Sequence, residues 1–109
     1  MSINIESTAC DILSLYPVKK AAFFGSAARG EFTDHSDIDI LVEFLPDTRG
    51  ILFFGLHMDL EKAFARHVDL LTYDALFTEA KASFKENVLR DERVIYEREN
   101  KNNSGAHVG

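Results

Sequence analysis

The 109-residue sequence is poor in several features that mark other protein classes. Its single cysteine, Cys10, excludes a disulfide within the chain and is typical of a small buried apolar side chain. It has no secretory signal, lipidation motif or long apolar stretch, so we expect a cytoplasmic protein that does not enter a membrane. The 12 lysine and arginine residues are outnumbered by 18 acidic ones, giving a net charge of −6, and form no dense cluster. Direct nucleic-acid binding is therefore disfavoured, because it normally requires a positive surface.

A glycine and a serine follow a segment of strand type. Residues 18–24 (VKKAAFF) are rich in β-branched and aromatic side chains and predict a short strand. Gly25 and Ser26 at its end let backbone N–H groups approach an anion, with the serine hydroxyl as a further donor. Residues 27–30 favour one helical turn, whose N–H groups and Arg29 would suit a phosphate. By itself this pattern is also typical of an ordinary turn.

Two aspartates follow at a spacing that places them on one face of a strand. Residues 37–44 (DIDILVEF) alternate with period two, so Asp37 and Asp39 project to the same side. Like charges so close repel each other, and a divalent cation between them reverses the sign of that interaction. The alternative is a solvated strand face that is acidic without a ligand.

A third aspartate lies in another segment of strand type, residues 67–73 (HVDLLTY). If this strand pairs beside the first, Asp69 completes a three-carboxylate cluster. Such a cluster can hold two metal ions roughly 3.5–4 Å apart, and Asp69 could accept the proton of an incoming hydroxyl. The alternative is an exposed acid on an edge strand. The four histidines show no metal-ligand spacing.

The remaining pattern predicts one α/β domain of the α+β type over residues 1–97, with a disordered polar tail at 98–109. Helical periodicity covers residues 3–15, 51–66 and 75–89, and residues 94–96 predict a last short strand. We expect a small mixed β-sheet with helices packed mainly on one face and the acidic face open to substrate.

The stretch from Gly25 to Phe44 resembles the signature of the minimal nucleotidyltransferases, within the DNA polymerase β-like nucleotidyltransferase superfamily. That signature is Gly-Ser, ten residues, Asp-x-Asp and a later single aspartate. Gly25, Ser26, Asp37, Asp39 and Asp69 match it position by position. The resemblance spans about residues 18–96, and it implies the polymerase β-like nucleotidyltransferase fold, ATP as substrate and Mg²⁺, with two ions expected.

The resemblance also implies roles for individual residues. Gly25 and Ser26 would hold the triphosphate, with the Ser26 hydroxyl on the β- and γ-phosphates. Asp37 and Asp39 would join the metals to the triphosphate, and Asp69 would bind the catalytic metal and help to deprotonate the acceptor hydroxyl. Arg29 would stabilise charge on the triphosphate or the pyrophosphate, and a surface salt bridge to Glu31 or Asp34 is the alternative for it.

Many members of the resembled family are antitoxins paired with a HEPN-domain toxin RNase. The resemblance therefore implies AMP transfer to a hydroxyl of such a toxin, because the chain has no room for a second, acceptor-binding domain. One alternative is a non-catalytic antitoxin that covers its partner sterically. The other is transfer to a small-molecule or nucleic-acid hydroxyl. The acceptor, the base selectivity, the number of nucleotides transferred and homo-oligomerisation stay open.

Overall fold

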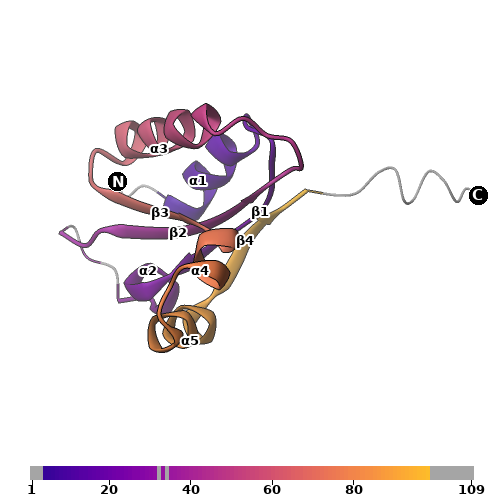
Figure 1. The fold of residues 1–109 in the computed structure, drawn as a ribbon. Helices are drawn as coiled ribbons and strands as arrows, with labels where there is room; N and C mark the ends of the chain where they lie inside the picture. The colour runs from indigo at the N-terminus through magenta and orange to yellow at the C-terminus, as the bar shows by residue number, and fades with distance from the viewer. Residues whose placement is uncertain (1–3, 32, 34, 99–109) are drawn as a thin grey trace, which may run out of the picture.

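A four-stranded sheet with the strand order β3-β2-β1-β4 organises the protein (Figure 1). The computed structural model describes residues 4–31, 33 and 35–98. The strands are β1 (Val18–Phe24), β2 (Ile38–Phe44), β3 (Val68–Thr72) and β4 (Arg93–Glu97). The helices are α1 (Ile5–Leu13), α2 (Gly25–Arg29), α3 (Ile51–Phe64), α4 (Tyr73–Thr78) and α5 (Ala82–Asp91). Apart from Arg98, the predicted tail lies outside the described residues.

The sheet is mixed, as predicted. Strand β1 is antiparallel to both β2 and β4, whereas β2 and β3 are parallel. A parallel pair needs a crossover connection, and α3 supplies it between β2 and β3. The expected last strand is confirmed as β4, which extends the sheet on the free edge of β1. No helix in the described part of the chain has the length and apolar character needed to cross a lipid bilayer.

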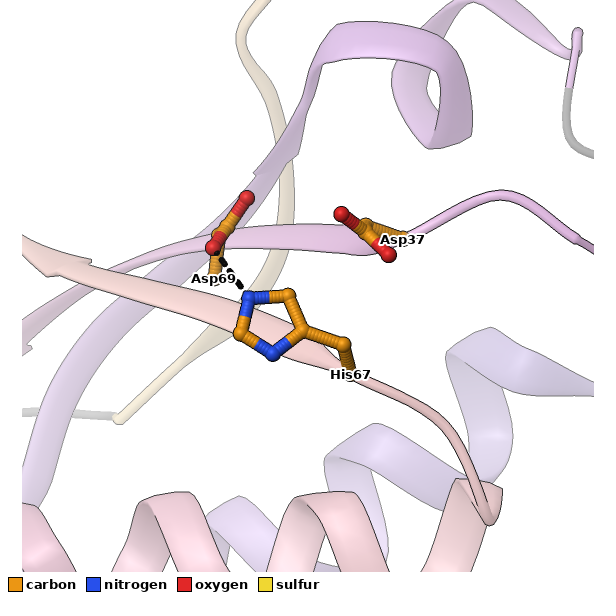
Figure 2. Close-up of side chains that lie close together, drawn as sticks. All are labelled: Asp37, His67 and Asp69. Atoms are coloured by element: carbon orange, nitrogen blue, oxygen red, sulfur yellow. Dashed lines mark hydrogen bonds and ion pairs between the residues drawn. The ribbon is translucent and has the colours of Figure 1, made fainter.

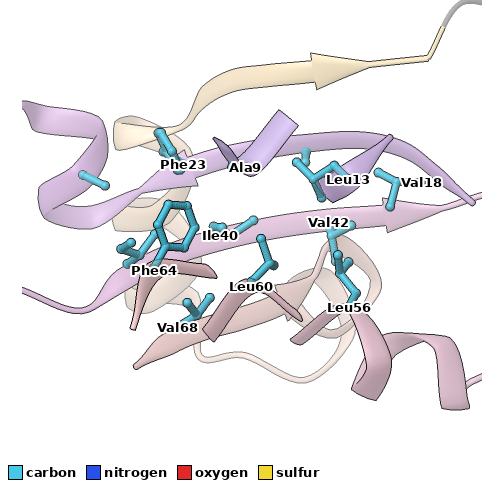
Figure 3. Close-up of a cluster of buried hydrophobic side chains, with 13 residues drawn as sticks. Ala9, Leu13, Val18, Phe23, Ile40, Val42, Leu56, Leu60, Phe64 and Val68 are labelled. Atoms are coloured by element: carbon cyan, nitrogen blue, oxygen red, sulfur yellow. The ribbon is translucent and has the colours of Figure 1, made fainter. Parts of the chain in front are cut away.

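One face of the sheet is covered by α1 and α3 (Figure 1). The alternation in β2 directs Ile38, Ile40 and Val42 to this face, where they are fully buried. Against them pack Leu13 of α1 and Leu60 of α3, together with other apolar side chains of the same cluster (Figure 3). Burial of apolar surface on this scale is the main force that holds the sheet and these helices together.

The second face carries more helical cover than the sequence indicated. Leu41 of β2 points to this side and packs with Leu76 of α4 and Val88 of α5. The prediction of one helix over residues 75–89 is wrong, because α4 ends at Thr78 and α5 begins at Ala82. A continuous helix would hold Leu76 and Val88 about 18 Å apart along its axis. The break lets both side chains bury against the same part of the sheet.

The arrangement leaves one edge of the sheet for the predicted site. The C-terminal end of β1 and the N-terminal ends of β2 and β3 meet there, because β1 runs against β2 and β2 runs with β3. In this register Asp39 lies opposite Phe24 on one side and Asp69 on the other. The pairing of β3 beside β2, on which the three-carboxylate hypothesis depended, is therefore present.

Candidate active site

The turn after β1 requires a glycine for two independent reasons. Gly25 has a φ of +65°, in the left-handed region that other residues seldom adopt. A Cβ atom at this position would also lie 2.4 Å from Oδ2 of Asp39, well inside van der Waals contact. The missing side chain thus makes room for the Asp39 carboxylate beside the backbone of the turn.

The three predicted aspartates converge at the edge where β1 ends and β2 and β3 begin. Asp37 directly precedes β2, and Asp39 and Asp69 are register partners in the parallel pair. Asp37, Asp69 and His67 each place one ligand atom within 4.8 Å of the others (Figure 2). Carboxylate oxygens suit hard divalent cations. The carboxylates of Asp37 and Asp69, with Asp39 beside them, therefore fit a divalent cation.

The pKa of Asp39 is raised by its partial burial beside two other carboxyl groups. Partial burial raises this pKa to about 7, and the hydrogen bond to Asp69 and the charges of Asp69 and Asp37 act in the same direction. His67 opposes the shift with its positive charge. Without a cation, ionisation of all three aspartates is unfavourable because their negative charges repel one another. A bound cation would offset this repulsion.

We predict that the metal-free protein is less stable at alkaline pH. The pKa of Asp39 is about 7 in the folded protein, against an ordinary 3.8. Protonated Asp39 therefore stabilises the folded state fully below pH 3.8, and this stabilisation is lost as the pH rises through 7. The hydrogen bond to Asp69 raises the pKa of His67, so titration of His67 also lowers stability as the pH rises. Because most of this loss occurs between the two pKa values of Asp39, we expect the Tm in EDTA to fall between about pH 4 and pH 8.

The matched variant for this measurement is Asp39→Asn, which removes the raised carboxyl and keeps its shape. We expect it to flatten the fall in Tm and to raise the Tm at the alkaline end by about 4 °C, the equivalent of about 1 kcal/mol after allowance for solvent screening. A wild-type Tm that stays level or rises over this range in EDTA would contradict the electrostatic description of the site.

Ser26 and Arg29 lie in the short helix α2, which begins at Gly25. The main-chain oxygen of Ser26 accepts a hydrogen bond from the N–H of Glu31 at 3.0 Å, which closes the turn. The guanidinium of Arg29 donates to Glu31 at 3.0 Å and to Asp91 at 2.6 Å, and so joins α2 to α5. The structure thus brings Arg29 to these two acids and not to the three aspartates. Of the two salt-bridge partners expected for it, Glu31 is found and Asp34 lies outside the described residues.

His67 is the member of the cluster that the sequence analysis missed. Its Nε2 atom lies 2.7 Å from Oδ1 of Asp69 (Figure 2). The spacing of the four histidines alone does not indicate it. A usable signal was present in the strand alternation, because His67 and Asp69 are two residues apart and share a face.

Comparison with known proteins gives a family and named relatives. The family model described as polymerase beta, nucleotidyltransferase matches residues 8–101. A Methanocaldococcus jannaschii protein, named as an inferred protein adenylyltransferase, is 42% identical over 77 residues, covering 70% of this chain and 83% of that protein. The protein adenylyltransferase MntA of Thermococcus cleftensis is 35% identical over 81 residues, covering 74% of this chain and 76% of that protein.

Solved structures share the fold at low sequence identity. A chain of a toxin–antitoxin complex with AMP-PNP superposes with a TM-score of 0.67 at 22% identity, covering 93% of this chain and 79% of that one. A chain of a Shewanella oneidensis complex, described as a tri-AMPylated HEPN toxin with its MNT antitoxin, gives 0.61 at 18% identity, with coverage of 94% and 76%. Together with the family match over residues 8–101, they confirm the predicted fold. This chain therefore belongs to the polymerase beta nucleotidyltransferase family, and its enzymatic class is that of a nucleotidyltransferase.

Proposed function

We propose that this chain transfers AMP from ATP to a hydroxyl group of a partner protein, and that the partner is a HEPN-type toxin which the modification silences. The observation that carries the proposal is the convergence of Asp37, Asp39 and Asp69 beside the Gly25 turn. The names of the relatives support protein as the acceptor class. The AMPylated HEPN toxin in the Shewanella oneidensis complex supports the kind of partner.

The three aspartates are the proposed holders of Mg²⁺, with two ions in the complete site. A bound cation would polarise the α-phosphate of ATP and neutralise charge that develops on the departing pyrophosphate. Asp37 and Asp39 would serve the ions that contact the triphosphate, and Asp69 the ion nearest the acceptor. The raised pKa of Asp39 supports this assignment, because a carboxyl crowded by like charges gains most from a cation.

The proposed reaction balances with no other reactant. The acceptor oxygen forms a bond to the α-phosphorus, the bond from that phosphorus to the bridging oxygen of the β-phosphate breaks, and pyrophosphate leaves. Asp69 is the proposed acceptor of the hydroxyl proton, since it is the most distant of the three aspartates from the Gly25 turn in the strand order. Gly25 and Ser26 would hold the triphosphate, and Arg29 would add positive charge from the end of α2.

The consequence for the partner follows from charge and size. Each AMP attached to a hydroxyl adds a negatively charged phosphodiester and a bulky nucleoside. Near the active site of an RNase, both would oppose entry of the negatively charged RNA backbone. Silencing by modification therefore needs no tight, permanent complex between the two proteins.

The test is incubation of the purified protein with α-labelled ATP, Mg²⁺ and the product of the neighbouring gene, followed by intact mass of both proteins. We expect the partner to gain the mass of one or more AMP groups and to lose RNase activity. γ-Labelled ATP and an EDTA-treated sample are the controls, and neither should label the partner. Tight binding without a mass gain would favour a steric antitoxin. Neither binding nor a mass gain would redirect the search to small-molecule acceptors.

A further inference from the structure

A second layer of polar contacts supports Asp69 from the side of α3. Glu61, in the last turns of that helix, accepts a hydrogen bond from the main-chain N–H of Val68 at 3.0 Å. The same carboxylate oxygen lies 3.1 Å from Nδ1 of His67. The other ring nitrogen of His67, Nε2, lies 2.7 Å from Oδ1 of Asp69. An unbroken line of contacts thus runs from Glu61 through the imidazole to the aspartate.

His67 is held at three points, two on its imidazole and one on its main chain. A ring with a carboxylate on each of its two nitrogens has one orientation in which both contacts are made. The backbone of His67 is fixed as well, because its carbonyl oxygen accepts a hydrogen bond from the N–H of Ile38, the first residue of β2, at 3.2 Å. His67 is therefore held against the starts of both strands that carry the aspartates.

Glu61 is itself held in place by a neighbouring turn of its helix. His57, one turn earlier on α3, has its Nε2 atom 3.2 Å from Glu61 and 2.7 Å from the carbonyl oxygen of Val68. The carboxylate of Glu61 thus lies between the N–H of Val68 and two imidazoles. This arrangement joins the C-terminal part of α3 to the start of β3 through side chains.

Asp69 needs such support because it is exposed and its hydrogen bond to Asp39 joins it to another acid. Its side chain is 54% exposed, and its neighbours Asp39 and Asp37 are also acids. Mutual repulsion would turn an unsupported Asp69 carboxylate toward solvent, away from a cation bound between the acids. The contact with His67 engages Oδ1 of Asp69 and so fixes the orientation of the carboxylate.

We propose that Glu61 and His67 are positioning residues, which hold Asp69 in the orientation that the divalent cation site requires. The inference rests on the proposed function, in which Asp69 is a cation ligand. His67 acts through Asp69 and not as a ligand, because each of its ring nitrogens already faces a carboxylate. Outer residues that orient metal ligands contribute about 10- to 100-fold to metal affinity or activity.

The experiment measures Mn²⁺ binding to the nucleotide-free protein by electron paramagnetic resonance, alongside the AMP-transfer assay. We expect His67→Ala to weaken Mn²⁺ binding by about 10-fold or more and to lower kcat with little change in the KM for ATP. His67→Gln should recover most of the affinity, because its amide can donate to Asp69 as Nε2 does. Glu61→Ala should weaken binding in the same direction by a smaller factor.

His35→Gln is the matched control, since His35 is an exposed histidine in the loop before Asp37 and should behave as wild type. If wild type binds Mn²⁺ and His67→Ala binds it equally well, the positioning role is overturned while the proposed function stands. If His67→Gln is as damaged as His67→Ala, the imidazole is needed as a ligand and the positioning role is overturned too. Absence of Mn²⁺ binding by wild type would overturn both proposals.

Discussion

We expect Asp39→Asn to cause the largest loss of the proposed AMP transfer among single substitutions, while the protein stays folded. Asparagine keeps the shape of the side chain but removes the negative charge that a divalent cation requires. We expect kcat to fall on the order of 10³-fold or more, which corresponds to about 4 kcal/mol of lost transition-state stabilisation. The fold survives because the substitution removes repulsion from Asp37 and Asp69 at a half-buried position.

Single-turnover transfer with α-labelled ATP measures the loss, and circular dichroism with a thermal melt verifies the fold. Asp11→Asn is the matched control, because Asp11 is an exposed aspartate of α1 and does not belong to the cluster of Asp37, Asp39 and Asp69. It undergoes the same chemical change and should retain full activity. Turnover by Asp39→Asn at the wild-type rate would refute the assignment of Asp39 to the catalytic site.

Gly25→Ala is the second substitution with a large expected effect. The new methyl group would lie 2.4 Å from Oδ2 of Asp39, so either the turn or the carboxylate must move. The backbone at φ +65° adds about 1–2 kcal/mol of conformational cost for a residue with a side chain. We expect transfer to fall by about 100-fold or more, because a displacement on the order of 1 Å in a catalytic group has that effect. The transfer assay and a thermal melt report the two effects separately.

A second glycine provides a control that separates backbone strain from the steric clash with Asp39. Gly30, at the end of α2, has a φ of +75°, but a Cβ atom there would have no neighbour within 4 Å. Gly30→Ala should therefore lose about as much stability as the backbone strain costs Gly25→Ala, and it should keep most of its activity. Equal loss of activity in both variants would mean that general destabilisation, and not the contact with Asp39, explains the result at Gly25.

The alternation and periodicity of apolar residues along the chain predicted most of the strands and helices. The strand expected over residues 18–24 coincides with β1, and the alternation in residues 37–44 assigned the apolar side chains of β2 to the faces on which they pack. Period two is a property of the extended backbone itself, so it can be read without tertiary information. The predicted helix over residues 75–89 was wrong because both halves have helical periodicity, and the break between them reflects which side chains the sheet can bury.

The sequence by itself determined the residues of the candidate site on the first two strands: a Gly-Ser turn and two aspartates with one residue between them, which backbone geometry places on one face. The tertiary structure alone decided what surrounds them. Parallel pairing of β2 with β3 brings Asp69 beside Asp39, and the end of α3 brings Glu61 to His67. These contacts join residues whose proximity depends on how helices and strands bury their apolar faces, and no local spacing encodes that choice.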